Sequence, residues 1–222
     1  MSASIDLSRI HFPVTSLGPG SRIGIWFQGC SIRCPGCISM DTWAPGKGTT
    51  SVDEVVRTIS RWIGMADGVT ISGGEPFDQS VALFELLARI RALTKADILV
   101  FTGYLWSAIS ERLASSPGMI DALVTGPFDL NVTQTRALRG SDNQELHLLT
   151  PLGRARFASF ERDLDQRDRT LDVMFDDNGD VWFAGIPRRG DFRRLHQLIE
   201  NTGATLSTSE DNRVLLPKTC PQ

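Results

Sequence analysis

The stretch IGIWFQGCSIRCPGC, residues 23–37, joins an apolar segment to a loop rich in cysteine. Its first five residues are a short apolar run, typical of a buried strand. Cysteine, proline and glycine then recur until about residue 48, which predicts a long loop. Three of the four cysteines lie in this loop, and the fourth is Cys220. Because the three are crowded together, they favour a metal or cluster site over a disulfide framework.

Beyond this loop, strands and amphipathic helices are expected to alternate. Apolar spacing predicts three helices, over 51–63, 83–90 and 105–113, and three further strands, over 69–72, 98–101 and 122–125. Ser51 and Glu54 match a capping box at the start of the first helix. This order predicts a parallel sheet with right-handed crossovers.

Each of the four strands is followed by an unusual motif. The motifs are GCSIRCPGC after the first strand, SGGEP after the second, TGY after the third and TGPF after the fourth. The carboxyl ends of parallel strands lie at one edge of a sheet, and that edge is where α/β proteins build their sites. The four motifs are therefore predicted to form one site.

The spacing Cys30-x3-Cys34-x2-Cys37 supplies three thiolates from one loop. Three ligands for a four-iron cube leave one iron without a protein ligand, where a substrate or cofactor can bind. The alternative is a structural zinc site, which needs four ligands. His11 or Cys220 would complete it.

The spacing CX3CX2C resembles the signature of the radical S-adenosylmethionine (SAM) enzymes, and Ser72-Gly73-Gly74-Glu75-Pro76 resembles their GGEP motif. In that family the open iron of a [4Fe-4S] cluster is chelated by the amino and carboxylate groups of SAM. The resemblance implies that the three cysteines are the metal ligands. It also implies that Glu75 accepts hydrogen bonds from the methionine ammonium group.

Longer segments are similar to the activating enzyme of anaerobic ribonucleotide reductase, a subfamily of glycyl-radical activases. The cluster loop GCSIRCPGCISMDTW carries Gly36 before its third cysteine, as in that subfamily. The segments 101–104, 123–128 and 138–144 resemble its third-strand, fourth-strand and RGSxNQ motifs. The resemblance covers about residues 12–147.

The resemblance implies an α/β fold with a partial (β/α)6 TIM-like barrel of parallel strands, to which the residues beyond it add a C-terminal β-hairpin and helix. The radical SAM core is expected at 1–147 and a C-terminal extension, as a substrate or partner element, at 148–222. The implied SAM-binding residues, besides Glu75, are Gly36, Ser72, Gly73, Gly74, Thr102, Gly103 and Arg139.

Two of these assignments have alternatives. Thr102 and Gly103 equally suit a tight turn between strand and helix. The guanidinium of Arg139 suits the SAM carboxylate, and an arginine also suits the surface. No catalytic side chain is assigned, because the cluster and SAM carry the chemistry.

The implied reaction is reductive cleavage of SAM to methionine and a 5′-deoxyadenosyl radical, which removes a hydrogen atom from the substrate. A flavodoxin or ferredoxin-type reductant and a glycyl-radical enzyme are the implied partners. Two alternatives stay open: a radical SAM enzyme acting directly on a peptide or small metabolite, and a structural zinc-binding module. One cysteine left over cannot build an auxiliary cysteine-ligated cluster, which favours the activase.

The chain departs from the subfamily at three places. Thr125 stands where the fourth-strand motif usually carries an acidic residue, so no ribose contact is assigned there. Ile38-Ser39-Met40 replace the usual residues after the third cysteine. The chain also continues well past Gln144.

The C-terminal third is expected to contain a hairpin, a helix and a last strand. Asn178-Gly179 is a strong hairpin signal, and a helix is expected from Asp191 to near Gly203, with a strand at 213–216. The alternating residues Val173 and Phe175, opposite Val181 and Phe183, are expected to pack on the core. Arg188 and Arg189 are expected near solvent, where the segment docks a partner or covers a sheet edge.

Composition excludes several other classes. The chain has 222 residues, 41% hydrophobic and 22% charged, which is ordinary for a globular protein. Its 23 basic and 26 acidic residues lack the basic footprint of a nucleic-acid binder. No apolar run approaches the roughly 20 residues of a membrane span, and the N-terminus lacks a signal-peptide pattern. A cytoplasmic protein with neither nucleic-acid nor membrane partners is expected.

Overall fold

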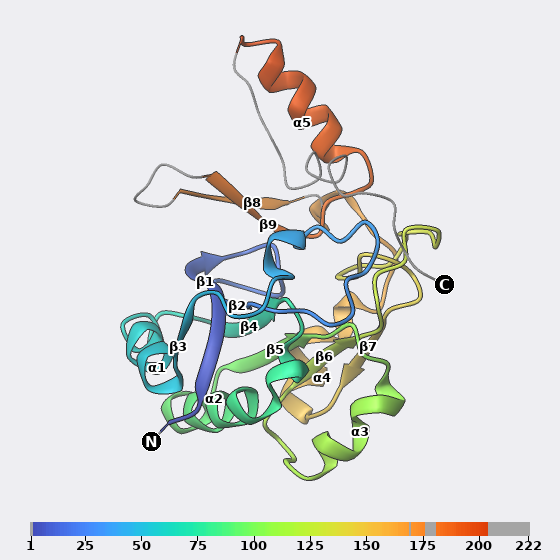
Figure 1. Ribbon diagram of the computed structural model, residues 1–222. Coiled ribbons are helices and arrows are strands. Elements are labelled where there is room, and N and C mark those ends of the chain that lie inside the picture. Colours follow the sequence, from blue (N-terminus) through green and yellow to red (C-terminus); the bar gives the residue numbers. More distant parts are fainter. Residues whose placement is uncertain (1, 169, 176–180, 204–222) are drawn as a thin grey trace, which may run out of the picture.

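Four parallel strands form the middle of a seven-stranded sheet (Figure 1). The computed structural model describes residues 2–168, 170–175 and 181–203. The strand order is β3-β1-β2-β4-β5-β6-β7. The parallel strands are β2 (Arg22–Phe27), β4 (Gly68–Gly73), β5 (Asp97–Phe101) and β6 (Ala122–Thr125). The antiparallel strands are β1 (Ser4–Val14), β3 (Thr49–Ser51) and β7 (Glu145–Leu148).

Three helices connect the parallel strands, as the apolar spacing predicts. They are α1 (Val52–Ser60), α2 (Ser80–Leu93) and α3 (Trp106–Ala114). The hydroxyl of Ser51 accepts a hydrogen bond from the backbone N–H of Glu54, which confirms the predicted cap of α1. Short 3₁₀ turns lie at Met40–Thr42, Pro76–Gln79, Ala158–Phe160 and Gln166–Asp168.

The two faces of the sheet are covered by different parts of the chain. Successive side chains of a strand point to opposite faces, so Ile25 and Phe27 pack with the helices while Trp26 faces the other way. Trp26 packs against the C-terminal hairpin of β8 (Leu171–Phe175) and β9 (Val181–Gly185). Helix α4 (Pro151–Phe157) buries Phe157 against β5 and β6, and α5 (Asp191–Glu200) follows the hairpin.

The hairpin pairing is confirmed, but the face expected to pack on the core is wrong. Val173 pairs with Phe183 and Phe175 with Val181, yet Phe175 is 72% exposed. Met174 and Ala184, on the opposite face, are buried against Trp26. Both faces of the hairpin carry apolar residues, so alternation alone does not distinguish them. The expected turn at Asn178-Gly179 and strand at 213–216 lie outside the described residues.

The parallel α/β sheet is confirmed, whereas a partial (β/α)6 barrel is not. In the part of the chain that the structure describes, four strands run parallel and antiparallel strands flank them. The described part of the segment 153–170 contains the end of α4 and short turns. Strand β1, which the sequence analysis does not predict, pairs with both β2 and β3.

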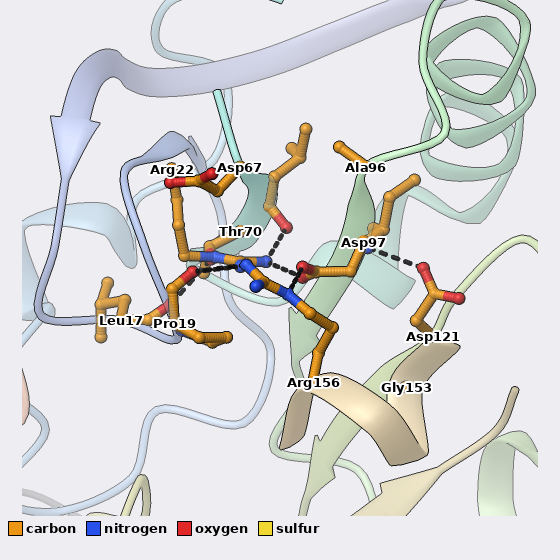
Figure 2. Close-up of polar contacts among 12 residues, drawn as sticks. Leu17, Pro19, Arg22, Asp67, Thr70, Ala96, Asp97, Asp121, Gly153 and Arg156 are labelled. Atoms are coloured by element: carbon orange, nitrogen blue, oxygen red, sulfur yellow. Dashed lines mark hydrogen bonds and ion pairs between the residues drawn. The ribbon is translucent and has the colours of Figure 1, made fainter. Parts of the chain in front are cut away.

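A buried network of ion pairs lies at the amino ends of the parallel strands (Figure 2). The side chains of Arg22 and Asp97 are both fully buried, and their closest nitrogen and oxygen lie 2.5 Å apart. Asp97 also accepts a hydrogen bond from Arg156 at 2.9 Å. Arg22 donates further to the hydroxyl of Thr70 and the carbonyl of Val69. The charges are thus compensated at this edge, which leaves the carboxyl edge for the site.

We expect Asp97→Ala to lower the free energy of unfolding by about 3–5 kcal/mol, because it leaves the buried Arg22 guanidinium without a counter-charge. The control is Asp53→Ala, which breaks an exposed pair with Arg89 and should cost at most about 1 kcal/mol. Urea denaturation of both variants measures the difference. Equal losses in the two variants would contradict a supporting role for the network.

Candidate functional site

A cavity of about 480 Å³ lies where the motifs after the four parallel strands meet. Its lining includes every predicted site residue except Arg139: Cys30, Cys34, Gly36, Cys37, Ser72, Gly73, Gly74, Glu75, Thr102 and Gly103. Gly126 and Phe128, from the fourth motif, line it too. The structure therefore brings all four motifs together, as the parallel sheet predicts.

The three cysteines are half-buried and none forms a disulfide with a described residue. Burial raises the pKa of the Cys30 thiol and of the Cys34 thiol. For Cys34, the nearby Cys37 and Cys30 add to this rise in pKa, since adjacent thiolates repel. Such thiols stay protonated until a metal cation takes the place of the protons. Three soft sulfur donors in one half-buried loop fit an iron–sulfur cluster.

Gly36 lets the cysteine loop pack against the fourth motif. Its φ is +84°, a conformation that favours glycine. A Cβ at this position would lie 3.1 Å from the ring of Phe128 and 3.1 Å from Leu130. The glycine before the third cysteine is therefore matched to the apolar side chains that follow β6.

The loop after β4 is fastened to the cysteine loop by its backbone. The N–H of Gly74 donates to the carbonyl of Phe27, and the N–H of Glu75 donates to the carbonyl of Gly29, both at 2.8 Å. A Cβ on Gly74 would lie 2.1 Å from that Gly29 oxygen, so only glycine allows this approach. The SGGEP motif thus positions the start of the cysteine loop.

The Glu75 carboxylate links the second motif to the third. It is 1% exposed and accepts hydrogen bonds from the N–H of Phe77, the hydroxyl of Thr102 and the N–H of Gly103, at 2.8–2.9 Å. Burial raises the pKa of Glu75 to about 7, although the three donors oppose the rise. Thr102 and Gly103 both follow β5 in a turn and line the cavity.

Asp78 is a further linking residue that the sequence analysis missed. Its carboxylate accepts hydrogen bonds from the N–H and hydroxyl of Ser31 and from the hydroxyl of Tyr104. It therefore joins the cysteine loop to the third motif. In the sequence, the position of Asp78 three residues after Glu75 is the only indication of this linking role.

Arg139 does not reach the cavity. Its side chain is buried and donates to the carboxylate of Glu161 and to the carbonyl of Ala137. Thr125 also points away, since its hydroxyl contacts the ring of His147 at 2.9 Å. From the RGSxNQ segment, Gly140 and Gln144 line the cavity instead.

The C-terminal extension supplies the remaining wall of the cavity. The lining includes residues 183–190, 192 and 193. Arg188, expected near solvent, is half-buried in this wall, while Arg189 is exposed and donates to the carbonyls of Asp129 and Val132. Trp43 also lines the cavity, beside the cysteine loop.

The zinc alternative finds no support in the described residues. No group of three His, Cys, Asp or Glu side chains among them is spaced to hold a single metal ion. His11 packs edge-on against Trp182, 5.7 Å between ring centres, and does not line the cavity. Cys220 lies outside the described residues. A zinc ion needs its sulfur ligands within about 2.3 Å, whereas a four-iron cube holds each cysteine at a separate corner.

The family described as a 4Fe-4S single cluster domain matches residues 16–147. An anaerobic ribonucleoside-triphosphate reductase-activating protein of Escherichia coli (strain K12) is 31% identical over 148 residues, which are 63% of this chain and 96% of that protein. The protein of the same name from Enterobacteria phage T4 is 27% identical over 134 residues, covering 58% of this chain and 85% of its own length. A pyruvate formate-lyase-activating enzyme of Listeria monocytogenes is 39% identical over 94 residues, 39% of this chain and 38% of that enzyme. The resemblance that the motifs indicate is confirmed. None of the described helices is long and apolar enough to cross a membrane.

The raised pKa of Glu75 predicts a pH-dependent stability. The carboxyl group titrates at about 7 in the folded protein and near 4.5 when unperturbed. Between these values the folded protein binds a proton that the unfolded chain has lost, so the free energy of unfolding falls as pH rises. This loss should be up to about 3 kcal/mol larger for the wild-type chain than for Glu75→Gln, which cannot titrate.

Urea denaturation of the cluster-free protein at about pH 5 and about pH 8 measures this difference. Glu54→Gln, a change on the exposed surface of α1, should keep the wild-type pH dependence. If Glu75→Gln keeps it as well, the folded-state titration does not belong to Glu75.

Proposed function

The chain belongs to the family of the 4Fe-4S single cluster domain, and we propose that it is a radical SAM activase that generates a glycyl radical on a partner enzyme. The observation that carries the proposal is the single cavity lined by the three cysteines, the SGGE residues and the Thr102-Gly103 turn. The names of the relatives support an activase function, since one describes an activating protein of a reductase and the other an activating enzyme of a lyase.

The cluster would be held by Cys30, Cys34 and Cys37. The bound group would supply one-electron reduction of SAM, which would give methionine and a 5′-deoxyadenosyl radical. The protein's own task is to hold SAM in a fixed orientation and to exclude water. Trp26 and Trp43, which line the cavity, supply apolar surface for this purpose.

The SAM-binding residues are proposed from the second and third motifs. Glu75 presents a buried carboxylate whose negative charge favours the methionine ammonium group. Its hydrogen bonds with Thr102 and Gly103 also hold the third motif in place. The Glu75 side chain would therefore both bind SAM and position the third motif. The glycines at 36, 73, 74 and 103 bring backbone close to the ligand.

The division of the chain follows from the same proposal. The radical SAM core comprises residues 1–147, and the family match, which ends at residue 147, supports this boundary. The assignment of this core as a partial barrel rests on the resemblance. The extension at 148–222 acts on the substrate or partner. A flavodoxin or ferredoxin-type reductant supplies the electron.

A second function is favoured by one observation. Residues 183–193 of the extension contribute a wall of the cavity, which a small peptide or metabolite would contact directly. The second candidate is therefore a radical SAM enzyme that acts on such a substrate without a glycyl-radical partner.

Cluster ligation is tested by cysteine replacement. Changing any one of Cys30, Cys34 or Cys37 to Ala should abolish bound iron and sulfide after anaerobic reconstitution, and with them the cleavage of SAM. Cys220→Ala should leave both intact, because three ligands suffice. Loss of the cluster in the Cys220 variant would overturn the proposed ligand set.

The two functions are separated by the site of the final radical. With the reduced enzyme, SAM and the large glycyl-radical enzyme of the same organism, the activase predicts a persistent glycine-centred radical in the electron paramagnetic resonance spectrum. Both reactions release 5′-deoxyadenosine, but activity on a small substrate predicts a modified small product and no persistent protein radical. Absence of the protein radical despite SAM cleavage would favour the second function.

A further inference from the structure

The wall formed by residues 183–193 is built into the cavity but lies beyond the family match. It comprises the end of β9, the loop that follows and the start of α5, and it lies beside the loop after β2 in Figure 1. The proposed cluster and SAM ligands, in contrast, all precede residue 147. The wall is therefore available for recognition of something other than the cofactors.

Several contacts hold this wall in place. Trp182 packs edge-on against Trp26, with ring centres 5.3 Å apart. The side-chain amide of Gln134 donates to the carbonyl of Pro187 at 3.1 Å, and Arg189 donates to the carbonyls of Asp129 and Val132. The backbone N–H of Arg188 donates to the carboxylate of Asp191 at 2.9 Å. The wall is thus fixed to the loop that follows the fourth motif.

Arg188 is the residue of this wall with a buried polar atom that lacks a partner among the described residues. Its side chain is half-buried, and its Nε atom is buried without a hydrogen-bond partner. Its neighbours differ: Arg189 and Arg193 are exposed to solvent, and Arg194 pairs with Asp191. A buried guanidinium nitrogen without a partner is unfavourable, and a ligand oxygen would satisfy it.

The acidic residues that line the cavity are already engaged. They are Asp41, which pairs with Arg9, and Glu75, which accepts three hydrogen bonds. Neither forms an ion pair with Arg188 in the described part of the chain. Among the described residues, neither acidic side chain of the lining supplies Arg188 with a counter-charge, so a bound carboxylate would supply one.

The wall around Arg188 combines apolar residues with two exposed arginines, Arg189 and Arg193. Phe183, Ile186, Pro187 and Phe192 line the same wall, and the rings of Phe183 and Phe192 lie 5.7 Å apart. A guanidinium fork binds a carboxylate with two parallel hydrogen bonds, and apolar neighbours strengthen that pair by excluding water. The wall therefore suits a carboxylate that stands next to an apolar side chain.

We propose that Arg188 binds a carboxylate of the polypeptide from which the hydrogen atom is removed, while the apolar wall receives a neighbouring side chain. The inference rests on the proposed function for the reaction and adds the chemistry of the substrate. The cavity recognises a segment in which an acidic residue stands beside an apolar residue, close to the reacting glycine.

The test measures peptide binding by the reconstituted full-length enzyme with SAM. Three pools of N-acetylated, C-amidated pentapeptides are compared. Every peptide contains glycine and one apolar residue in varied order, and the pools differ in whether they carry Glu, Gln or Lys. Bound peptide is quantified by ultrafiltration and mass spectrometry. The wild-type enzyme should retain the Glu pool about tenfold more than the Gln pool, the scale of a charge-assisted hydrogen bond.

Arg188→Gln should reduce this preference to near unity, and Arg188→Lys should retain part of it. The matched control is Arg194→Gln, which removes the same charge from α5 outside the cavity lining and should keep the wild-type preference. A wild-type enzyme without preference for the Glu pool overturns the proposal, as does a preference that survives in Arg188→Gln.

Calorimetric titration of SAM into the same variants tests whether Arg188 binds the carboxylate of SAM instead. If Arg188→Gln weakens SAM binding and leaves the peptide preference unchanged, Arg188 recognises the cofactor and the proposal fails. Failure of the proposed function is a distinct result, because it appears as the absence of a glycine-centred radical on the partner enzyme, whatever the peptide preference.

Discussion

The buried carboxylate of Glu75 is the interaction on which the rest of the site depends. It accepts hydrogen bonds from the loop after β4 and from the turn after β5, while the backbone of the same residue is bonded to the cysteine loop after β2. Three strand ends therefore share one anchor. Its acceptance of three donors keeps a costly buried charge satisfied, and its position in the cavity lining leaves it available to a ligand cation.

The two edges of the parallel sheet are specialised in opposite ways. At the amino edge, Arg22 and Asp97 neutralise each other in a fully buried pair, so that edge is sealed. At the carboxyl edge, loops with glycine at close approaches leave space between them, and that space is the cavity. The C-terminal extension adds a wall to the cavity and, through Met174 and Ala184, covers the face of β2 that the helices leave open. One segment thus completes both the core and the site.

Local periodicity and motif position predicted most of this arrangement, because the parallel sheet brings sequence-distant strand ends to one edge. The exceptions have identifiable causes. Arg139 binds Glu161, whose segment carries no clear pattern, so its true partner was not visible in the sequence. The hairpin has apolar residues on both faces, and only packing against Trp26 selects Met174 and Ala184. The contribution of residues 183–193 to the cavity depends on how the hairpin docks, which is a long-range contact without a local signal.

The central claim is that the cavity brings SAM to the iron that no cysteine binds. The most direct measurement is electron–nuclear double resonance of the reduced, reconstituted protein with SAM that carries ¹⁵N in its amino group. The account predicts a hyperfine coupling between that nitrogen and the cluster spin. A spectrum without this coupling, from a sample in which calorimetry shows SAM to be bound, would contradict it.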